Sequence, residues 1–182
     1  MGSDMIQNNV TQYREKHKRF LSTALLFVFT FLLAVCVLNA VNQTLAFTVR
    51  VEGSSMNPLL KNGDVVVVSR TAEVKRGSVV VVDLPEGGPV IKRVIAFGGE
   101  TVWSVHGNVY VQTEGETIVL NEGYVATENA GGADVARITV PQGHVFLLGD
   151  NRAVSLDSRV FGAVELENVM GVVTTFWLKH KF

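Results

Sequence analysis

Residues 78 to 96 read SVVVVDLPEGGPVIKRVIA, and this stretch decides the fold of the surrounding chain. Its two runs of β-branched residues, Ser78–Leu84 and Val90–Ala96, are separated by Gly and Pro, which is the pattern of strands bounded by turns. Four consecutive valines, residues 79–82, are typical of a strand that is buried on both faces. We therefore expect a mainly β domain built as a compact, coiled antiparallel sheet.

Similar runs lie on both sides of this stretch. One strand should end near Glu52, and His106-Gly107-Asn108 should join two others as a hairpin turn. Amphipathic helical periodicity of useful length is not found, and residues 114–136 have few large apolar side chains, so we expect a solvated excursion there with one short hairpin at most. The further strands we expect are Asp64–Ser69, Thr101–Val105, Val109–Thr113, His144–Leu148 and Val169–Phe176.

The N-terminal part has a different character. Phe20–Val41 contains no charged residue and would span about 33 Å as a helix, which is long enough to cross a bilayer. A cleaved signal sequence usually has a shorter apolar core, and a buried helix of this length seldom lacks all charge. We therefore predict an uncleaved transmembrane anchor at residues 20–43.

The flanking charges predict an orientation for this anchor. Arg14, Lys16, Lys18 and Arg19 precede it, whereas the next basic residue after it is Arg50. The positive-inside rule then places residues 1–19 in the cytoplasm and residues 44–182 on the extracytoplasmic face of the plasma membrane, in a single-pass protein. Residues 1–4 resemble an expression scar joined to a native start at the second methionine, and they are left out of the fold prediction.

Composition excludes several classes of function. The formal net charge is −1 and no basic face stands out, which argues against nucleic acid as a partner. The single cysteine, Cys36, lies in the most apolar run, so neither a disulfide framework nor a cysteine zinc site is expected. No cofactor is indicated.

Three polar segments of the β domain carry candidate chemistry. The first is the turn Gly53–Pro58, which presents small hydroxyl residues just after the anchor, although Ser and Gly are also ordinary turn formers. In the second, Lys92 and Arg93 interrupt a run of β-branched residues and must point to opposite faces of the strand. One of the two should face the interior, which is costly for a charge unless the group is neutral or partnered, while the plain alternative is an edge strand with two surface charges.

The third segment, Gly149–Arg159, reads GDNRAVSLDSR and directly follows an apolar strand. Asp150, Asn151 and Asp157 could supply oxygen ligands to calcium, but their spacing does not match the EF-hand loop, so we expect no metal site. The segment is instead interpreted as a loop held by hydrogen bonds.

Together these segments resemble the motifs of type I signal peptidases. Ser-Met-x-Pro occurs as Ser55–Pro58, Lys-Arg-Val-Ile as Lys92–Ile95, and Gly-Asp-Asn-Arg-x-x-Ser-x-Asp-Ser-Arg as Gly149–Arg159. With the anchor before them, the resemblance covers nearly the whole chain. It implies a β-rich catalytic core of the compact, single-anchor type, because the interval from Lys92 to Gly149 is short.

The resemblance also implies roles for individual residues. Ser55 would be the nucleophile and Lys92 its general base, which must be desolvated to be neutral at working pH. Ser155 would orient the Lys92 amine. Asp157 and Arg159, with Arg93 as a further candidate, would form a supporting ion-pair network.

Substrate and partners follow from the same resemblance. The enzyme would cut signal-peptide-bearing preproteins with small residues at the first and third positions before the bond, at the surface of a lipid bilayer, and association with the secretion machinery is a further expectation. Met56, Leu60 and Ile91 flank the motifs and are candidate pocket residues, although each could equally be core. The backbone N–H of Ser55 should contribute to the oxyanion hole, and Gly53 removes the side-chain donor that some family members have two residues before the nucleophile.

Several other functions stay open. Self-cleaving regulators related to the LexA repressors share the Ser-Lys chemistry but need no anchor, and a peptidase dedicated to a conjugation or pilus system would carry the same motifs. A catalytically silent, membrane-tethered assembly protein is opposed by the presence of both Ser55 and Lys92. A Ser-His-Asp hydrolase is disfavoured because Gly53-Ser54-Ser55-Met56-Asn57 lacks the second glycine of the nucleophile elbow.

Overall fold

The computed structural model describes residues 2–126 and 134–177. The chain forms two compact units, Met1–Thr44 and Leu45–Phe182. The first is helical and the second is almost entirely β-structure, so the predicted fold class, a mainly antiparallel β domain preceded by one apolar helix, is confirmed.

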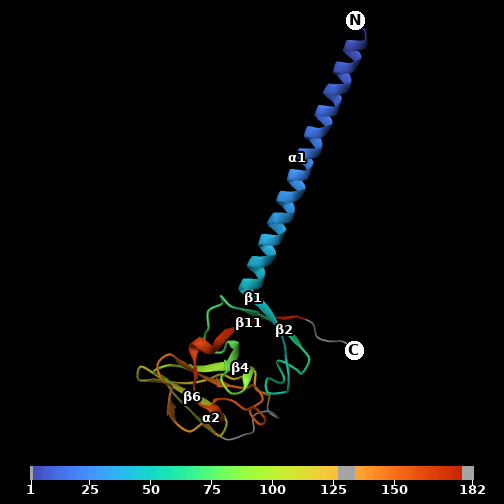
Figure 1. Ribbon diagram of the computed structural model, residues 1–182. Helices are drawn as coiled ribbons and strands as arrows, with labels where there is room; N and C mark the ends of the chain where they lie inside the picture. The colour runs from blue at the N-terminus through green and yellow to red at the C-terminus, as the bar shows by residue number, and fades with distance from the viewer. Residues whose placement is uncertain (1, 127–133, 178–182) are drawn as a thin grey trace. The chain divides into compact units, whose positions relative to one another are not determined.

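The helix α1, Gly2–Leu45, forms the N-terminal unit and is drawn as one uninterrupted helix, coloured from blue to cyan, in Figure 1. Its central part is rich in Leu, Phe, Val and Ala and contains no proline, so nothing interrupts the backbone hydrogen bonds. Within the segment Lys16–Val41, a window of 18 residues reaches a mean hydropathy of 2.7, and the segment is long and apolar enough to cross a bilayer. The predicted anchor lies within this helix, and its exact membrane bounds stay a prediction.

The larger sheet has seven strands in the order β1-β2-β11-β3-β4-β9-β10, and all neighbouring strands are antiparallel. The C-terminal strand β11 is inserted between β2 and β3, so strands far apart in the sequence pair in the centre of the sheet. The bounds are β1 Ala46–Arg50, β2 Val65–Ser69, β3 Val79–Leu84, β4 Gly88–Phe97, β9 His144–Leu148, β10 Val164–Glu165 and β11 Val169–Trp177.

The smaller sheet has four strands in the order β7-β6-β5-β8. Its central hairpin turns at His106 and Gly107, which both have positive φ, as the predicted turn requires. Two short elements, the helix α2 (Ser158–Phe161) and the 3-10 helix η2 (Leu166–Asn168), lie outside both sheets. The strand bounds are β5 Thr101–Val105, β6 Asn108–Thr113, β7 Glu116–Val119 and β8 Ile138–Thr139.

All strands expected from β-branched runs are present, to within a few residues at their ends. The strands β8 and β10 and the helix α2 were not predicted, because two-residue strands and a four-residue helix carry no detectable period. The expected excursion at 114–136 contains β7, paired to β6, and residues 127–133 of it lie outside the described part of the chain.

The valines of β3 show why both faces of the larger sheet are covered. Val79 and Val81 belong to one buried cluster, and Val80 and Val82 belong to another. Alternate side chains of a strand point to opposite faces, so an unbroken valine run is stable only where both faces are buried. A third cluster joins the two sheets and includes Ile95 of β4. The strand β4 is therefore held on every side, and it carries Lys92 at a fixed position.

Candidate active site

Ser55 lies on a turn that follows β1. The turn is closed by backbone hydrogen bonds from Asn57 N to Ser54 O (3.1 Å) and from Leu60 N to Met56 O (2.9 Å). Met56 and Leu60 are each 1% exposed and anchor the turn in the core. Burial of these two side chains, worth about 1.5 to 3 kcal/mol each, fixes the half-buried Ser55 between them and the strand.

Lys92 approaches Ser55 from the interior of the larger sheet. It pairs with Val80 on β3, and its side chain is only 4% exposed. The Lys92 Nζ donates to Ser55 Oγ at 2.8 Å, across 37 residues of sequence. Burial lowers the pKa of the Lys92 ammonium, and the negative charge of Asp157 partly opposes this effect. The two residues predicted to form a catalytic pair are thus brought together, with the amine in a site that favours its neutral form.

The segment after β9 closes over the Ser55 turn. Asn151 N donates to Ser55 O at 2.9 Å, and Asn151 Nδ2 donates to Ser54 O at 3.2 Å. A side chain at Gly149 would not fit here, because its Cβ would lie 2.2 Å from Ser155 Oγ and 2.6 Å from Ser55 O. The glycine therefore allows this loop to lie directly against the backbone of the serine.

Ser155 lies in the loop that packs against the Ser55 turn, but it forms no hydrogen bond with Lys92. Its hydroxyl is buried and has no hydrogen-bond partner within the described ranges of the chain. It is nevertheless near enough to the Asp157 carboxylate to help lower the pKa of that group. The predicted orienting contact with Lys92 is absent from this structure, which holds the Lys92 amine on Ser55 instead.

Asp157 and Arg159 form the expected ion pair. Arg159 Nε lies 2.8 Å from Asp157 Oδ1, and the Asp157 carboxylate also accepts from Gly149 N at 3.0 Å and caps helix α2 through Arg159 N. Burial would raise the pKa of Asp157, but the hydrogen bonds from Arg159 and Gly149 lower it overall. The pair ties both ends of the loop together.

Arg93 belongs to a different ion pair from the one proposed for it. Its guanidinium donates to both carboxylate oxygens of Asp150, at 2.8 and 2.6 Å, and both residues are buried. Lys92 and Arg93 are therefore both buried, where only one was expected to be, and each has a partner. The carboxylates weighed as calcium ligands, Asp150 and Asp157, are each engaged by an arginine.

A cleft of about 260 Å³ opens beside Ser55 and Lys92. Met56 and Ile91, two of the three candidate pocket residues, line it together with Val81. Leu60 packs in the same buried cluster but does not line the cleft. The lining of the cleft also includes the charged residues Arg50 and Glu52.

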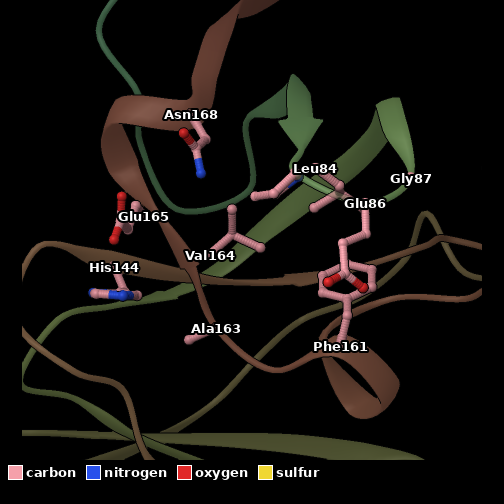
Figure 2. Close-up of a pocket in the computed structure, with 10 residues that line it drawn as sticks. Leu84, Glu86, Gly87, His144, Phe161, Ala163, Val164, Glu165 and Asn168 are labelled. Atoms are coloured by element: carbon pink, nitrogen blue, oxygen red, sulfur yellow. The ribbon is translucent and has the colours of Figure 1, made fainter.

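A larger cavity of about 590 Å³ lies elsewhere in the β unit (Figure 2). In Figure 2, Asn168 points into it from above Val164, while His144 and Glu165 lie on one side and Phe161 on the other. Serine and lysine do not occur among the residues that line it, so it offers no nucleophile with a neighbouring amine. The smaller cleft, which is lined by Ser55 and Lys92, is therefore the candidate active site.

Sequence reasoning missed part of the surroundings of this site. Glu122 and Tyr124, in the segment expected to be solvated, pack against Arg152 and Arg93 instead. The sequence signal was an acidic and an aromatic residue in an otherwise small and polar segment, which is a combination that a buried arginine can use.

Comparisons with known proteins found a family model that covers all three motif segments. A family model described as "Signal peptidase, peptidase S26" matches residues 23–178. Signal peptidase IB of Staphylococcus aureus (strain N315) is 29% identical over 173 residues, which cover 82% of this chain and 89% of that protein. Signal peptidase I V of Bacillus subtilis (strain 168) is 32% identical over 161 residues, covering 81% of this chain and 92% of that one. A crystal structure of a signal peptidase I from Enterococcus faecalis V583 matches with a TM-score of 0.47 and 30% identity, over 57% of this chain and 98% of that chain.

Proposed function

This chain belongs to the type I signal peptidases, the serine proteases of peptidase family S26, and we propose that it removes signal peptides with Ser55 as nucleophile and neutral Lys92 as general base. The observation that carries the proposal is the 2.8 Å separation of Lys92 Nζ and Ser55 Oγ at a buried lysine of lowered pKa. An exposed lysine amine is protonated at neutral pH and cannot accept a proton, whereas a desolvated one can.

The chemistry then runs through two half-reactions. The Lys92 amine takes the proton of Ser55 Oγ as the oxygen attacks the scissile carbonyl, and the resulting ammonium returns that proton to the leaving amine. Lys92 next takes a proton from water as the water attacks the acyl-enzyme, and it gives that proton back to Ser55 as the new carboxyl group is released. The backbone N–H of Ser55 is proposed as one donor to the oxyanion.

The loop Gly149–Arg159 is proposed to support this pair rather than to react. The Asp157–Arg159 ion pair and the bond from Asn151 N to Ser55 O hold the loop against the serine turn. Ser155 is proposed to position the Lys92 amine once substrate occupies Ser55, since its buried hydroxyl lies near the Asp157 carboxylate and has lone pairs that can accept from that amine.

Substrate selection is proposed to take place in the cleft beside the pair. Its lining of Met56, Ile91 and Val81 leaves about 260 Å³, which favours small residues such as alanine near the scissile bond. The substrates would be preproteins carrying N-terminal signal peptides.

The location follows from helix α1. An apolar helix that can span a bilayer, in a chain of this family, indicates a membrane-anchored protein. We place the N-terminus in the cytoplasm, because Arg14, Lys16, Lys18 and Arg19 precede the charge-free stretch Phe20–Val41. The β unit then lies on the extracytoplasmic face of the plasma membrane. There the β unit meets chains as they leave the membrane, where contact with the secretion machinery is also expected.

The experiment is cleavage of a defined preprotein. The full-length protein in detergent is given a preprotein with an Ala-x-Ala site, and the N-terminus of the product is sequenced. We expect a cut directly after the second alanine, and none with the Ser55→Ala variant. A product of the same N-terminus from Ser55→Ala would overturn the assignment of the nucleophile.

A further inference from the structure

A buried cluster of charged and aromatic side chains lies next to the catalytic pair. Arg93 is held by Asp150 on one side, and the ring centre of Tyr124 lies 3.9 Å from its guanidinium carbon on another. Arg152 Nη1 donates to Glu122 Oε2 at 2.9 Å, and Tyr124 Oη donates to Glu122 Oε1 at 2.7 Å. Glu122 and Tyr124 therefore bind two arginines that come from separate parts of the chain, and this pair is called the clasp below.

The charges in this cluster are balanced only when the clasp is in place. The side chains of Arg93 and Arg152 are 9% and 7% exposed, Asp150 is fully buried, and Glu122 is 10% exposed. Without Glu122, Arg152 would be left with the Gly149 carbonyl and the more distant charge of Asp150. A buried guanidinium in that position would compete with Arg93 for Asp150.

The cluster is connected to both members of the catalytic pair by covalent neighbours. Arg93 directly follows Lys92 on β4. Asn151 stands between Asp150 and Arg152 and donates its N–H to the carbonyl of Ser55. A shift of either arginine would thus move the strand that carries the base or the loop that fixes the nucleophile.

We propose that Glu122 and Tyr124 act as positioning residues for peptide hydrolysis, by clasping Arg152 and Arg93 so that Ser55 and Lys92 stay in reacting geometry. The inference rests on the proposed function, since it assigns these residues a part in that reaction. Neither residue lies in the cleft beside Ser55. Their effect is therefore on the rate of the chemical step and not on substrate affinity.

A purely structural role makes a different prediction. A residue that only stabilises the fold changes the fraction of folded enzyme and leaves kcat per folded molecule and its pH dependence unchanged. Loosening of the clasp instead lets water reach Lys92. Because burial is what lowers the pKa of Lys92, hydration raises that pKa and moves the rising limb of the pH profile to higher pH.

The test uses the full-length enzyme and the Ala-x-Ala preprotein, with kcat, KM and the pH profile measured well below the unfolding temperature of each variant. In Tyr124→Phe the ring over Arg93 is kept, and in Tyr124→Leu it is lost. We expect Tyr124→Leu to lower kcat by about tenfold or more at a nearly unchanged KM, since a slight misplacement of reacting groups is costly. Tyr124→Phe should restore most of kcat, because the contact of the ring with the arginine remains.

The isosteric change Glu122→Gln is the second arm, and it decides the question if Tyr124→Leu does not fold. It removes one charge and keeps an acceptor for Tyr124 Oη, and it should lower kcat and raise the pH midpoint as well. Two variants outside the clasp are matched controls. Glu100→Gln, between β4 and β5, removes the charge of the part-buried pair with Arg76, and Tyr110→Leu, on β6, removes the ring stacked on Trp103. Both controls should lose stability and keep kcat.

Each outcome decides between the proposals. If the wild type cleaves and the clasp variants keep its kcat per folded molecule and its pH midpoint, the positioning role is wrong and the clasp is only structural. Equal kcat values for Tyr124→Phe and Tyr124→Leu would show that the contact between the Tyr124 ring and Arg93 does not contribute to kcat. A wild type that does not cut the preprotein would refute the proposed function itself, which is a separate result from either of these.

Discussion

The change Asp157→Ala tests how the loop beside the serine is held. Asp157 is fully buried, binds Arg159 through Oδ1 and Oδ2, accepts from Gly149 N, and caps helix α2. Removing one partner of a buried ion pair costs about 3 to 5 kcal/mol. In the variant, Arg159 still donates to the carbonyls of Arg152 and Ser155, which favours the lower end of this range of destabilisation.

Two further lost interactions increase the destabilisation expected for Asp157→Ala. The buried Gly149 N–H loses its acceptor, which costs about 1 to 3 kcal/mol, and the lost helix cap costs about 0.5 to 2 kcal/mol. These terms share one side chain and do not add fully, so we retain a total of about 3 to 5 kcal/mol. At about 4 °C per kcal/mol for a unit of this size, the unfolding temperature should fall by about 12 to 20 °C.

The same variant has a predicted effect on catalysis. The charge of Asp157 raises the pKa of Lys92 against the larger effect of burial. Its removal should therefore lower that pKa, and the rising limb of the pH profile should move to lower pH in the molecules that remain folded. This direction is opposite to that expected for the clasp variants.

The assay is thermal unfolding followed by circular dichroism, with kcat measured against pH at a temperature where the variant is folded. The control is Asp134→Ala, which removes an exposed carboxylate that accepts from the backbone of the hairpin turn at His106 and Gly107. It should cost much less stability and leave the pH profile unchanged. An Asp157→Ala protein that unfolds within a few degrees of the wild type would refute the reasoning about the buried pair.

Three other predictions concern the catalytic pair directly. Ser55→Ala and Lys92→Ala should each abolish cleavage of the Ala-x-Ala preprotein while circular dichroism shows an intact fold, and cleavage retained by either one would exclude that residue from the pair. Wild-type kcat should rise with pH through the lowered pKa of Lys92, since only the neutral amine accepts a proton, and a profile that is flat from about pH 5 to 10 would exclude a lysine base. Ser155→Ala should keep its unfolding temperature and lose about a hundredfold in kcat if the hydroxyl positions the base; a variant that is destabilised but turns over normally would make Ser155 a structural residue.

Much of the fold could be predicted from the sequence because the deciding signals are local. The valine run at 79–82 and its equivalents show a strand by composition alone, and the charge-free run of helix α1 shows an apolar span by length. The three polar segments indicated a candidate site for the same reason, since each is a short, continuous piece of sequence. The order of the strands was not predictable, because the insertion of β11 between β2 and β3 depends on pairing across most of the domain.

Only the tertiary structure decided which groups meet. In the structure Lys92 donates a hydrogen bond to Ser55, and Arg93 forms an ion pair with Asp150. The Ser155 hydroxyl does not make the hydrogen bond with Lys92 that the motif suggested. Glu122 and Tyr124, which the sequence analysis placed in a solvated segment, contact the buried side chains of Arg152 and Arg93 in the structure. Sequence by itself determined which residue types are present and which segments are strands, because period and hydrophobicity act over neighbouring residues. The partners of a buried charge are set by the folding of distant strands into one core, where each charge must be matched within a few ångströms at low dielectric.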